Sequence, residues 1–447
     1  MEKGVAIVGT GYVGLVTGAS FADLGHEVWG FDVDRKKIAN LKKGIMPFFE
    51  PGLRQLVKKN VARKKLHFTS DIREMTAHTD TYFITVGTPS RSDGSVDMKY
   101  VKSAVRMLAP YMKSRDVIVS KSTVPIGTAV VIRRLISKTF TGDFSVVSNP
   151  EFLQEARAIE SFVRPDRIIL GYESNVPRWA VQRMSRVYQR IKAPVIETDN
   201  RSAELIKYAA NVYLAGQISF INSIARLCEE IGADVDIISR ALRADKRIGE
   251  RAFLSAGIGY GGLCFPKDVR ALIKISQRIG YHFDYLSVIE KVNKEQRTFF
   301  VNKIRSVVKR LKGKHIAILG LSFKPKTDDI RDAPSLDVIR MLMRGGAHVR
   351  VHDPVAIPHV KKLFGDTIRY YTNPYSALRG ADIMGIVTEW PEYRKLDLNK
   401  VKRIMKKPNI IDGRNIFDPR RMAALGITYR AIGRGYFADP LVVTGKG

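Results

Sequence analysis

The chain has 447 residues, enough for about three ordinary domains, and its 45% hydrophobic and 9% aromatic content excludes a disordered or low-complexity chain. Its 75 lysine and arginine residues outnumber its 44 acidic residues, and the formal net charge of +31 favours anionic ligands. Because the basic clusters are short, scattered and not interleaved with aromatic residues, we do not expect a nucleic-acid partner.

The first predicted elements are a strand, a glycine-rich turn, a helix and a second strand. They cover Val5–Val8, the sequence GTGYVG at 9–14, Leu15–Leu24 and Glu27–Phe31. In this arrangement Gly9 permits a tight turn, Gly11 lets the backbone approach a pyrophosphate, and Gly14 allows the helix to contact the strand. Asp32, 23 residues after Gly9, is placed to bond the 2′-hydroxyl of an adenosine ribose. The stretch therefore predicts NAD, although Lys37 keeps NADP open because a base suits a 2′-phosphate.

Four more apolar runs alternate with predicted helices, which indicates an open, mostly parallel α/β sheet. These strands are predicted at Thr81–Val86, Asp116–Ser120, Ser145–Ser148 and Arg167–Leu170. Polar residues follow three of the runs, in the sequences GTP at 87–89, KSTVP at 121–125 and NPEFLQE at 149–155. Because ligands of such sheets bind at the carboxyl ends of the strands, these sequences are candidate ligand contacts.

A long helix is predicted next. It runs without proline over Arg201–Ile231, with Asp199 or Asn200 as its cap and Gly232 at its end. Lys207 and Asn211 are four residues apart and share one face of this helix, so they form either a solvated pair or a cation and an amide that address a common oxygen.

A glycine-rich stretch, GIGYGGLCFPKD at 257–268, leads to one of only two cysteines. Pro266 suits the first turn of a helix, which places Cys264 just ahead of a helix N-terminus, where the helix dipole favours the thiolate. Asp268 would oppose this effect, so a nearby cation is also expected. Cys264 is a candidate nucleophile; the alternative is a small buried residue in a tight turn.

With Cys228 and Cys264 as the only cysteines, no disulfide framework is expected, which fits a reducing compartment and a cytoplasmic protein. The uncharged windows 5–22 and 208–225 are too rich in glycine and polar residues to span a membrane.

A second α/β unit begins at Lys314. A connecting helix at about Ser287–Leu311 is predicted before this unit. The predicted elements of the unit are strands at His315–Leu319, Ala347–His352, Asp382–Thr388 and Asn409–Asp412, and a helix at Pro334–Arg344. The sequence GLSFK at 320–324 replaces the glycine fingerprint of the first unit. We therefore expect this unit to bind something other than the dinucleotide.

With these elements placed, the chain resembles the UDP-glucose/GDP-mannose dehydrogenase family over nearly its whole length. The resemblance rests on GTGYVGL at 9–15, EPGL at 50–53, VGTP at 86–89, KSTVP at 121–125, NPEFLQE at 149–155, PDRIILG at 165–171, ELIKYAAN at 204–211, GYGGLCFPKD at 259–268, FKPKTDDIRD at 323–332, TEW at 388–390 and DGRNIFD at 412–418. Eleven matches in the same order leave no room for chance similarity.

The resemblance implies a four-electron oxidation of UDP-glucose at C6 to UDP-glucuronate with two NAD per cycle. Cys264 would form a thiohemiacetal and then a thioester. Lys207 and Asn211 would stabilise the oxyanion, and Glu151, Asp268 and Thr123 would manage proton transfer and hydrolysis.

The resemblance also implies binding residues and no metal. The expected cofactor contacts are Gly9, Gly11, Tyr12, Val13, Gly14, Asp32, Lys37, Thr88, Ser122, Thr123, Glu155 and Arg331. The expected contacts of the nucleotide sugar are Phe152, Leu153, Glu155, Lys207, Asn211, Arg247, Tyr260, Gly261, Lys324 and Arg414.

The implied organisation is an NAD-binding Rossmann domain at 1–198, a helical dimerisation and catalytic domain at 199–300, and a Rossmann-like UDP-sugar-binding domain at 301–447. Arg247 matches an arginine that reaches the neighbouring subunit's sugar, so a homodimer or larger homo-oligomer is expected. The chain departs from the family pattern at Ala156, where glycine is usual, and at Gly216 and Gln217, where a basic residue is common.

Three alternatives remain open from the sequence. GDP-mannose or a UDP-N-acetylhexosamine could replace UDP-glucose. A two-electron hydroxyacid dehydrogenase would share the first domain and the helix with a lysine, but would not need Cys264. A non-enzymatic polyanion-binding protein is supported only by the net charge.

Overall fold

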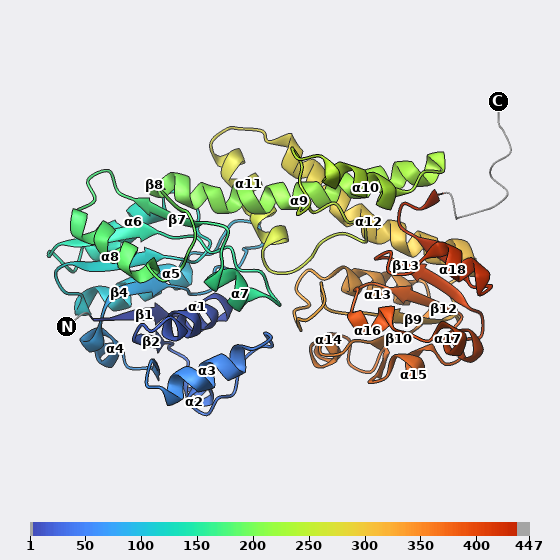
Figure 1. Cartoon of the computed structure of the whole chain (residues 1–447), viewed down its shortest axis with the longest axis horizontal. Helices are drawn as coiled ribbons and strands as arrows, with labels where there is room; N and C mark the ends of the chain where they lie inside the picture. The colour runs from blue at the N-terminus through green and yellow to red at the C-terminus, as the bar shows by residue number, and fades with distance from the viewer. Residues whose placement is uncertain (1–2, 436–447) are drawn as a thin grey trace. The chain divides into compact units, whose positions relative to one another are not determined.

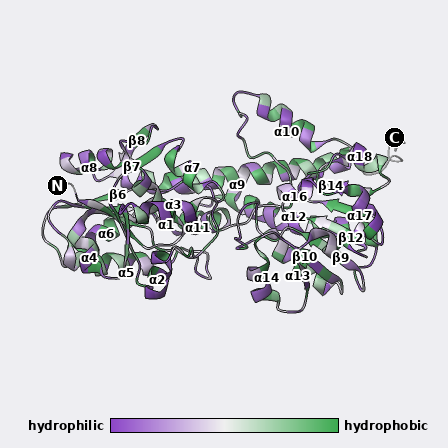
Figure 2. Ribbon diagram, turned by 60° about the horizontal axis from the view of Figure 1, so that its bottom comes forward, coloured by the Kyte–Doolittle hydropathy of each residue, from purple (hydrophilic) through white to green (hydrophobic). Residues whose placement is uncertain are grey.

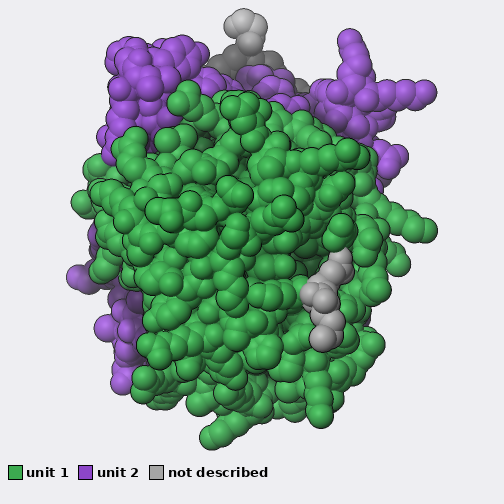
Figure 3. Space-filling view, turned by 90° about the vertical axis from the view of Figure 1, so that its left-hand side faces the viewer, with its two compact units in different colours: residues 1–210 green, residues 211–447 purple. Residues whose placement is uncertain are grey.

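The computed structural model describes residues 3–435 and divides into two compact units, residues 1–210 and residues 211–447 (Figure 1, Figure 3). Each unit is an α/β structure built on one sheet, as the alternation of apolar runs and helical segments predicted. The units are described separately below.

The sheet of the first unit has the strand order β3-β2-β1-β4-β5-β6-β7-β8 and is parallel except between β6 and β7. Its strands are β1 (Gly4–Val8), β2 (Val28–Phe31), β3 (Leu66–Thr69), β4 (Thr79–Ile84), β5 (Asp116–Ser120), β6 (Phe144–Ser148), β7 (Ile168–Tyr172) and β8 (Val195–Asp199). The strand order reverses at β1, which pairs with both β2 and β4. In open α/β sheets a crevice at such a reversal binds ligands.

Helices cover both faces of this sheet. They are α1 (Tyr12–Asp23), α2 (Arg35–Lys42), α3 (Leu53–Ala62), α4 (Ile72–His78), α5 (Lys99–Leu108), α6 (Thr128–Ile136), α7 (Ala158–Val163) and α8 (Arg178–Tyr188). Side chains of α1, α2, α3, α7 and α8 pack in one core cluster, and those of α4, α5 and α6 pack in another. Except for β8, the strands of this sheet are largely buried on both faces, and most of them therefore appear in the sequence as continuous apolar runs.

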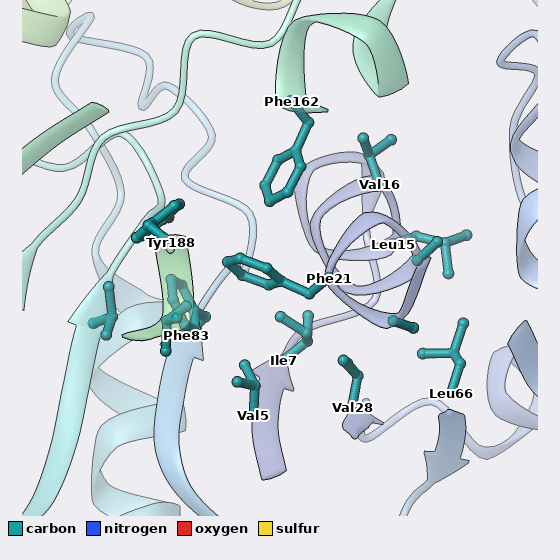
Figure 4. Close-up of a cluster of buried hydrophobic side chains, with 14 of the residues drawn as sticks. Val5, Ile7, Leu15, Val16, Phe21, Val28, Leu66, Phe83, Phe162 and Tyr188 are labelled. Carbon is teal, nitrogen blue, oxygen red and sulfur yellow. The ribbon is translucent and has the colours of Figure 1, made fainter. Parts of the chain in front are cut away.

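The first of these cores is centred on Phe21 of α1 (Figure 4). Its ring lies 5.2 Å from that of Phe83, 4.9 Å from that of Phe162 and 5.5 Å from that of Tyr188, measured between ring centroids. Strand β4 and helices α1, α7 and α8 are thereby packed together, and the segment between β6 and α7 is fixed at one end.

Helix α9 (Asn200–Ile231) passes through the division between the two units. The sequence left its cap open, and the structure assigns that role to Asp199, whose Oδ1 accepts a hydrogen bond from the backbone N–H of Ser202 at 3.0 Å. Asn200 instead accepts from the backbone N–H of Ser148, 2.9 Å away, and ties α9 to β6. Gly232, with φ +77°, follows the helix as predicted.

The second unit has a six-stranded parallel sheet in the order β11-β10-β9-β12-β13-β14. Its strands are β9 (His315–Leu319), β10 (His348–His352), β11 (Arg369–Tyr371), β12 (Ile383–Ile386), β13 (Asn409–Asp412) and β14 (Thr428–Ala431). Its helices, besides part of α9, are α10 (Val235–Ala244), α11 (Phe265–Arg278), α12 (Asp284–Val308), α13 (Pro334–Arg344), α14 (Ile357–Phe364), α15 (Pro374–Leu378), α16 (Pro391–Arg394), α17 (Leu398–Ile404) and α18 (Pro419–Ala424). In Figure 2, α10 carries hydrophobic and hydrophilic residues along its length, as expected of a helix with one buried face.

The predicted architectural repeat is confirmed, because the order of the second sheet equals that of the first six strands of the first sheet. The turn after the first strand is also alike: Gly9 and Gly320 have φ +103° and +96°, and each donates its N–H to the last residue of the neighbouring strand. Strands β3, β8, β11 and β14 were not predicted. They are three to five residues long and lie at or near sheet edges, so a long apolar run does not mark them.

Candidate active site

The turn after β1 has the geometry of a dinucleotide-binding loop. A Cβ on Gly9 would lie 2.9 Å from Val86 Cγ1, and a Cβ on Gly14 would lie 1.9 Å from the carbonyl oxygen of Gly9. Gly11, in contrast, has no atom within 4 Å of such a Cβ, so its backbone is open to a ligand. Helix α1 begins at Tyr12 without a side-chain cap, which leaves its first N–H groups for an anion. Gly9 and Gly14 thus serve the turn and the packing, and Gly11 the approach of a pyrophosphate.

Asp32 follows β2 at the same end of the sheet and is 8% exposed. Its Oδ2 accepts hydrogen bonds from the backbone N–H and hydroxyl of Thr10, and forms a 2.8 Å ion pair with Lys37. Although burial acts to raise the pKa of Asp32, Lys37 and the backbone donors lower it below its ordinary value, so the side chain is an anion. A carboxylate that also engages Lys37 suits the ribose 2′-hydroxyl and NAD better than a 2′-phosphate.

The loops after β4 and β5 meet this turn. Thr85 donates to the carbonyl oxygen of Gly9 at 2.8 Å, and Ser122 donates to that of Val86 at 2.7 Å. The predicted cofactor contacts Thr88 and Thr123 are half-buried in these loops. Three strand ends are therefore held together where the sequence placed the cofactor residues.

After β6, the structure brings together two residues that are distant in sequence. Glu151 Oε1 and Lys207 Nζ lie 2.8 Å apart, and their side chains are only 5% and 4% exposed. Glu151 Oε2 accepts from the backbone N–H of Leu153 at 2.6 Å, and the ring of Phe152 lies 5.3 Å from Lys207 Nζ. Burial acts to raise the pKa of Glu151, but Lys207, Leu153 and Lys121 outweigh it, so its pKa lies below the ordinary value. Glu151 is therefore held as a carboxylate anion.

Lys207 is placed by the first turns of α9. One carboxylate oxygen of Glu204 accepts from the backbone N–H of Ala129 at 2.9 Å, and the other accepts from that of Gly127. These bonds join α9 to the start of α6, while Asn200 joins it to β6. The lysine is thus presented by a helix that is fixed at two points, which favours a defined position of its amine.

Lys121 interacts electrostatically with Glu151 of this ion pair. It is the first residue of the KSTVP motif, and no role was predicted for it. It is 4% exposed, and its Nζ donates to Asn149 Oδ1 at 2.9 Å. Burial, opposed by the attraction of Glu151, lowers the pKa of Lys121 to about 8. A buried lysine cannot be recognised from the sequence, because nothing in KSTVP distinguishes it from an exposed one.

The unfolding free energy is expected to depend on the titration of Lys121. Because its ordinary pKa of 10.5 falls to about 8 in the folded state, the unfolded chain binds the extra proton between these pH values, and stability rises with pH across the window. At 1.36 kcal/mol per pKa unit, the rise is about 3 kcal/mol. Urea unfolding at several pH values should show this rise in the wild type but not in Lys121→Met. If the unfolding free energy depended on pH equally in both proteins, the lowered pKa of Lys121 would be contradicted.

In the second unit, Cys264 stands directly before α11, and proline occupies the first turn of this helix, as predicted. Asp268 is fully buried in that turn, and its carboxylate accepts from Asn211 Nδ2 at 2.6 Å and pairs with Lys267 Nζ at 2.5 Å. Its N–H donates to the carbonyl oxygen of Cys264 at 2.9 Å. Lys267 offsets the Asp268 charge next to the cysteine, whereas the resemblance assigned the positive charge near Cys264 to Lys207.

The glycines of 257–262 approach other parts of the same unit closely. A Cβ on Gly259 would lie 2.4 Å from Asn293 Oδ1, and one on Gly261 would lie 2.5 Å from the carbonyl oxygen of Asp332. The backbone N–H and carbonyl of Tyr260 both bond to the side chain of Asn293. At Gly259 and Gly261 the glycines therefore allow the chain to pack closely against itself.

Three further predicted contacts lie on the second unit. Arg414 donates through Nε to the carbonyl oxygen of Val387 at 2.8 Å. Arg331 pairs with Asp329 at 2.7 Å, and the side chain of Arg247 is 88% exposed and pairs with Asp245.

Two more features of the second unit bear on ligand binding. The amine of Lys324 lies 5.5 Å from the ring of Phe323. Asp353, the counterpart of Asp32, accepts hydrogen bonds from the backbone N–H groups of Leu321, Ser322, Val355 and Ala356. It is 2% exposed and so is not available to a ribose.

Within residues 3–435, none of the helices combines the length and apolar character that crossing a membrane requires. The same residues contain no group of three or more His, Cys, Asp or Glu side chains placed to hold a metal ion.

Comparison with known proteins adds three family matches. Models of the UDP-glucose/GDP-mannose dehydrogenase family match the NAD binding domain at residues 3–192, the central domain at 201–295 and the UDP binding domain at 317–419. The Gly9 turn, Asp32 and the Glu151 carboxylate lie in the first of these ranges, and Lys207, Asn211 and Cys264 lie in the second.

Individual proteins are similar over nearly the whole chain. The UDP-glucose 6-dehydrogenase TuaD of Bacillus subtilis (strain 168) is 45% identical over 97% of this chain and 93% of its own length. The UDP-glucose 6-dehydrogenase of Rhizobium meliloti (strain 1021) is 44% identical over 96% and 99%. A solved UDP-glucose dehydrogenase from the hyperthermophilic archaeon Pyrobaculum islandicum is 35% identical, with a TM-score of 0.90 over 98% of both chains. Because the matches extend through all three family domains, this protein belongs to the UDP-glucose/GDP-mannose dehydrogenase family and is an NAD-dependent dehydrogenase.

Proposed function

We propose that the protein oxidises UDP-glucose at C6 to UDP-glucuronate in two successive steps that share one covalent intermediate on Cys264. The observation that carries the proposal is the position of Cys264 at the start of α11, beside the Asn211, Lys267 and Asp268 cluster. A two-electron dehydrogenase needs no nucleophile, whereas an enzyme that oxidises an alcohol to an acid must retain its aldehyde.

The cofactor residues fit NAD, which supplies a hydride acceptor for each of the two oxidations. Gly9, Gly11, Tyr12, Val13 and Gly14 would hold its pyrophosphate, and Asp32 with Lys37 its adenosine ribose. We assign the remaining contacts to Thr88, Ser122, Thr123, Glu155 and Arg331.

In the proposed first step, Glu151, kept ionised by Lys207, accepts the proton of the C6 hydroxyl through Thr123 and a water molecule as the C6 hydride leaves. The sulfur of Cys264 then forms a bond to the aldehyde carbon, and the aldehyde oxygen becomes an oxyanion and takes up a proton. The cation of Lys207 and the amide of Asn211 would stabilise that oxyanion.

In the second step, the thiohemiacetal carbon loses a hydride and its hydroxyl loses a proton, which produces a thioester. Water adds to its carbonyl carbon, the carbon–sulfur bond breaks, and Cys264 recovers its proton. Asp268, bonded to Asn211 and Lys267, would accept a proton from that water. The balance is one UDP-glucose, two NAD and one water converted to UDP-glucuronate, two NADH and three protons.

Ten residues are assigned to binding of the sugar nucleotide. They are Phe152, Leu153, Glu155, Lys207, Asn211, Arg247, Tyr260, Gly261, Lys324 and Arg414. Support for UDP as the nucleotide comes from the UDP binding domain match, and support for glucose from the names of the two relatives above. GDP-mannose and UDP-N-acetylhexosamines are the alternatives to be tested.

A panel of NAD reduction assays tests this function. Purified protein is offered UDP-glucose, GDP-mannose, UDP-N-acetylglucosamine and UDP-N-acetylmannosamine in turn, and NADH and sugar acid are quantified. We expect the highest kcat/KM for UDP-glucose and two NADH for each UDP-glucose consumed. One NADH per sugar, with free aldehyde released, would falsify the covalent mechanism, and a higher kcat/KM for another sugar would reassign the substrate.

We also propose that the protein is a homodimer that forms through α9. Four large apolar side chains of this helix are exposed by half or more, at Tyr213, Phe220, Leu227 and Ile231. The first three recur every seven residues, which is typical of a helix that packs along another helix.

Replacing Phe220 with arginine is expected to convert the dimer to a monomer, because a charge at the centre of an apolar helix contact would be buried without a partner. Light scattering coupled to size exclusion measures the mass. Leu363→Arg is the matched control, since Leu363 is equally exposed on α14 and lies outside the stripe. A Phe220→Arg protein with the mass of the wild type would exclude this surface as the interface.

A further inference from the structure

The carboxylate of Glu50 joins two segments of the first unit that carry proposed ligand contacts. Its Oε2 accepts from the hydroxyl of Tyr12 at 2.6 Å and from the backbone N–H of Ala156 at 2.8 Å. Its Oε1 accepts from the backbone N–H of Ala158, also at 2.8 Å. Glu50 is 6% exposed, so these bonds form away from water, and each is strengthened by the negative charge. Glu50 is the first residue of the EPGL motif, and the sequence alone indicated no role for it.

The loop from Glu151 to Ala158 depends on these bonds for its shape. Ala156 has φ +69°, in the left-handed region that favours glycine, and it stands where glycine is usual in the family. Glu50 holds the N–H groups of Ala156 itself and of Ala158, two residues further on, and so fixes the chain in this strained conformation.

Packing alone does not fix the loop. Glu50 and Ala156 border a cavity of about 430 Å³ that is also lined by Pro51, Ile159 and Val163. A side chain or backbone that faces a cavity lacks van der Waals partners on that side. The hydrogen bonds to Glu50 therefore add to the packing of Ala158 in the core and help to set the position of this part of the loop.

The other side of the connection is Tyr12, the first residue of α1 and a neighbour of Gly11. Burial, together with the bond to Glu50, raises the pKa of Tyr12, so its hydroxyl stays protonated and donates. Its ring lies 4.9 Å from that of Phe48, which precedes Glu50 in the chain. A shift of the turn at Gly11 would thus displace the carboxylate of Glu50, because the hydroxyl of Tyr12 is bonded to it.

We propose that Glu50 is a positioning residue that couples NAD binding to nucleotide-sugar binding by linking Tyr12 to the loop that carries Glu151, Phe152 and Glu155. This inference rests on the function proposed above. A ligand that orders the Gly11 turn sets the position of Tyr12. Because the Glu50 carboxylate is bonded to both Tyr12 and Ala156, the position of Tyr12 then restricts the position of the loop. Because such coupling is reciprocal, the nucleotide sugar tightens dinucleotide binding by the same factor.

Calorimetric titration of the full-length protein tests the coupling. NADH and UDP-glucose are used because together they do not react, and the Kd of UDP-glucose is measured with and without saturating NADH. In the wild type we expect NADH to lower this Kd by about 5-fold or more, within the usual range of coupling between sites. In Tyr12→Phe, which removes only the connecting hydroxyl, and in Glu50→Gln, the ratio should fall to near one.

Glu160→Gln is the matched control, because Glu160 borders the same cavity but pairs with Arg157 and does not bond to Tyr12 or Ala156. It should keep the ratio of the wild type. If Glu50→Gln does not fold, Tyr12→Phe still decides the question, since its ring packing is retained. A ratio that is the same in Tyr12→Phe as in the wild type, or near one in the wild type, overturns the inference alone. A wild-type protein that binds neither ligand overturns the proposed function as well.

Discussion

Replacing Cys264 with serine is expected to lower kcat for UDP-glucuronate formation by on the order of 10⁴-fold, because removal of an enzyme's covalent nucleophile costs up to about 10⁶ in kcat. A serine hydroxyl is a much weaker nucleophile than a cysteine thiol and adds poorly to an aldehyde. The measurement is NADH formation from UDP-glucose and, separately, from its C6 aldehyde. With the aldehyde as substrate, NADH formation should be lost completely, because oxidation of the aldehyde requires the sulfur.

Cys228 provides the matched control for this substitution. It is 1% exposed on α9, and burial raises its pKa, so its thiol is inert. Cys228→Ser should retain the wild-type kcat, and iodoacetamide should modify Cys264 and spare Cys228. A Cys264→Ser enzyme that oxidises the aldehyde at a tenth or more of the wild-type rate would favour two independent hydride transfers without a covalent intermediate.

Replacing Lys207 with methionine should have two separable effects. The first is a fall in kcat of about 10²–10⁴-fold, the usual range for loss of a group that assists proton transfer. The second is a loss of about 3–5 kcal/mol of unfolding free energy, because the substitution leaves the buried Glu151 carboxylate without its cation. Steady-state kinetics measures the first effect and urea unfolding the second.

A second substitution distinguishes the catalytic effect from the structural one. In the double variant Lys207→Met with Glu151→Gln, the Glu151 carboxylate is removed together with its cation, so most of the lost stability should recover while kcat stays low. Lys303→Met breaks the pair of Lys303 with Glu229, whose side chains are 13% and 17% exposed, and should destabilise the protein without changing kcat. Recovery of kcat in the double variant would show that Lys207 serves only to neutralise Glu151.

Much of the fold could be predicted because its signals are local. Strands β5, β9 and β13 and helix α13 have the predicted bounds, since an apolar run or a proline at the first helical position marks each of them. Strand β8 could not be predicted from burial, because its residues, VIETD, are mostly exposed. Its place in the sheet depends on pairing with β7.

The candidate site also contains features that the sequence predicts and features that it does not. The turn at Gly9, Gly11 and Gly14 and the position of Cys264 before α11 follow from the sequence, because a glycine's freedom and a proline's fixed φ act on neighbouring residues. Lys267 and Glu50 were present in quoted motifs but had no assigned role. Their importance depends on which buried groups they face.

The sequence by itself therefore determined two units of alternating strands and helices, a long helix, a dinucleotide turn and a cysteine at a helix start, since each is set by residues within a few positions of one another. The tertiary structure alone decided that Lys207 neutralises Glu151, that Lys267 offsets Asp268, and that three hydrogen bonds converge on Glu50. The physical reason is that a buried charge must find its partner in space, and the partner of a buried carboxylate can come from any part of the chain that the fold brings within hydrogen-bond distance.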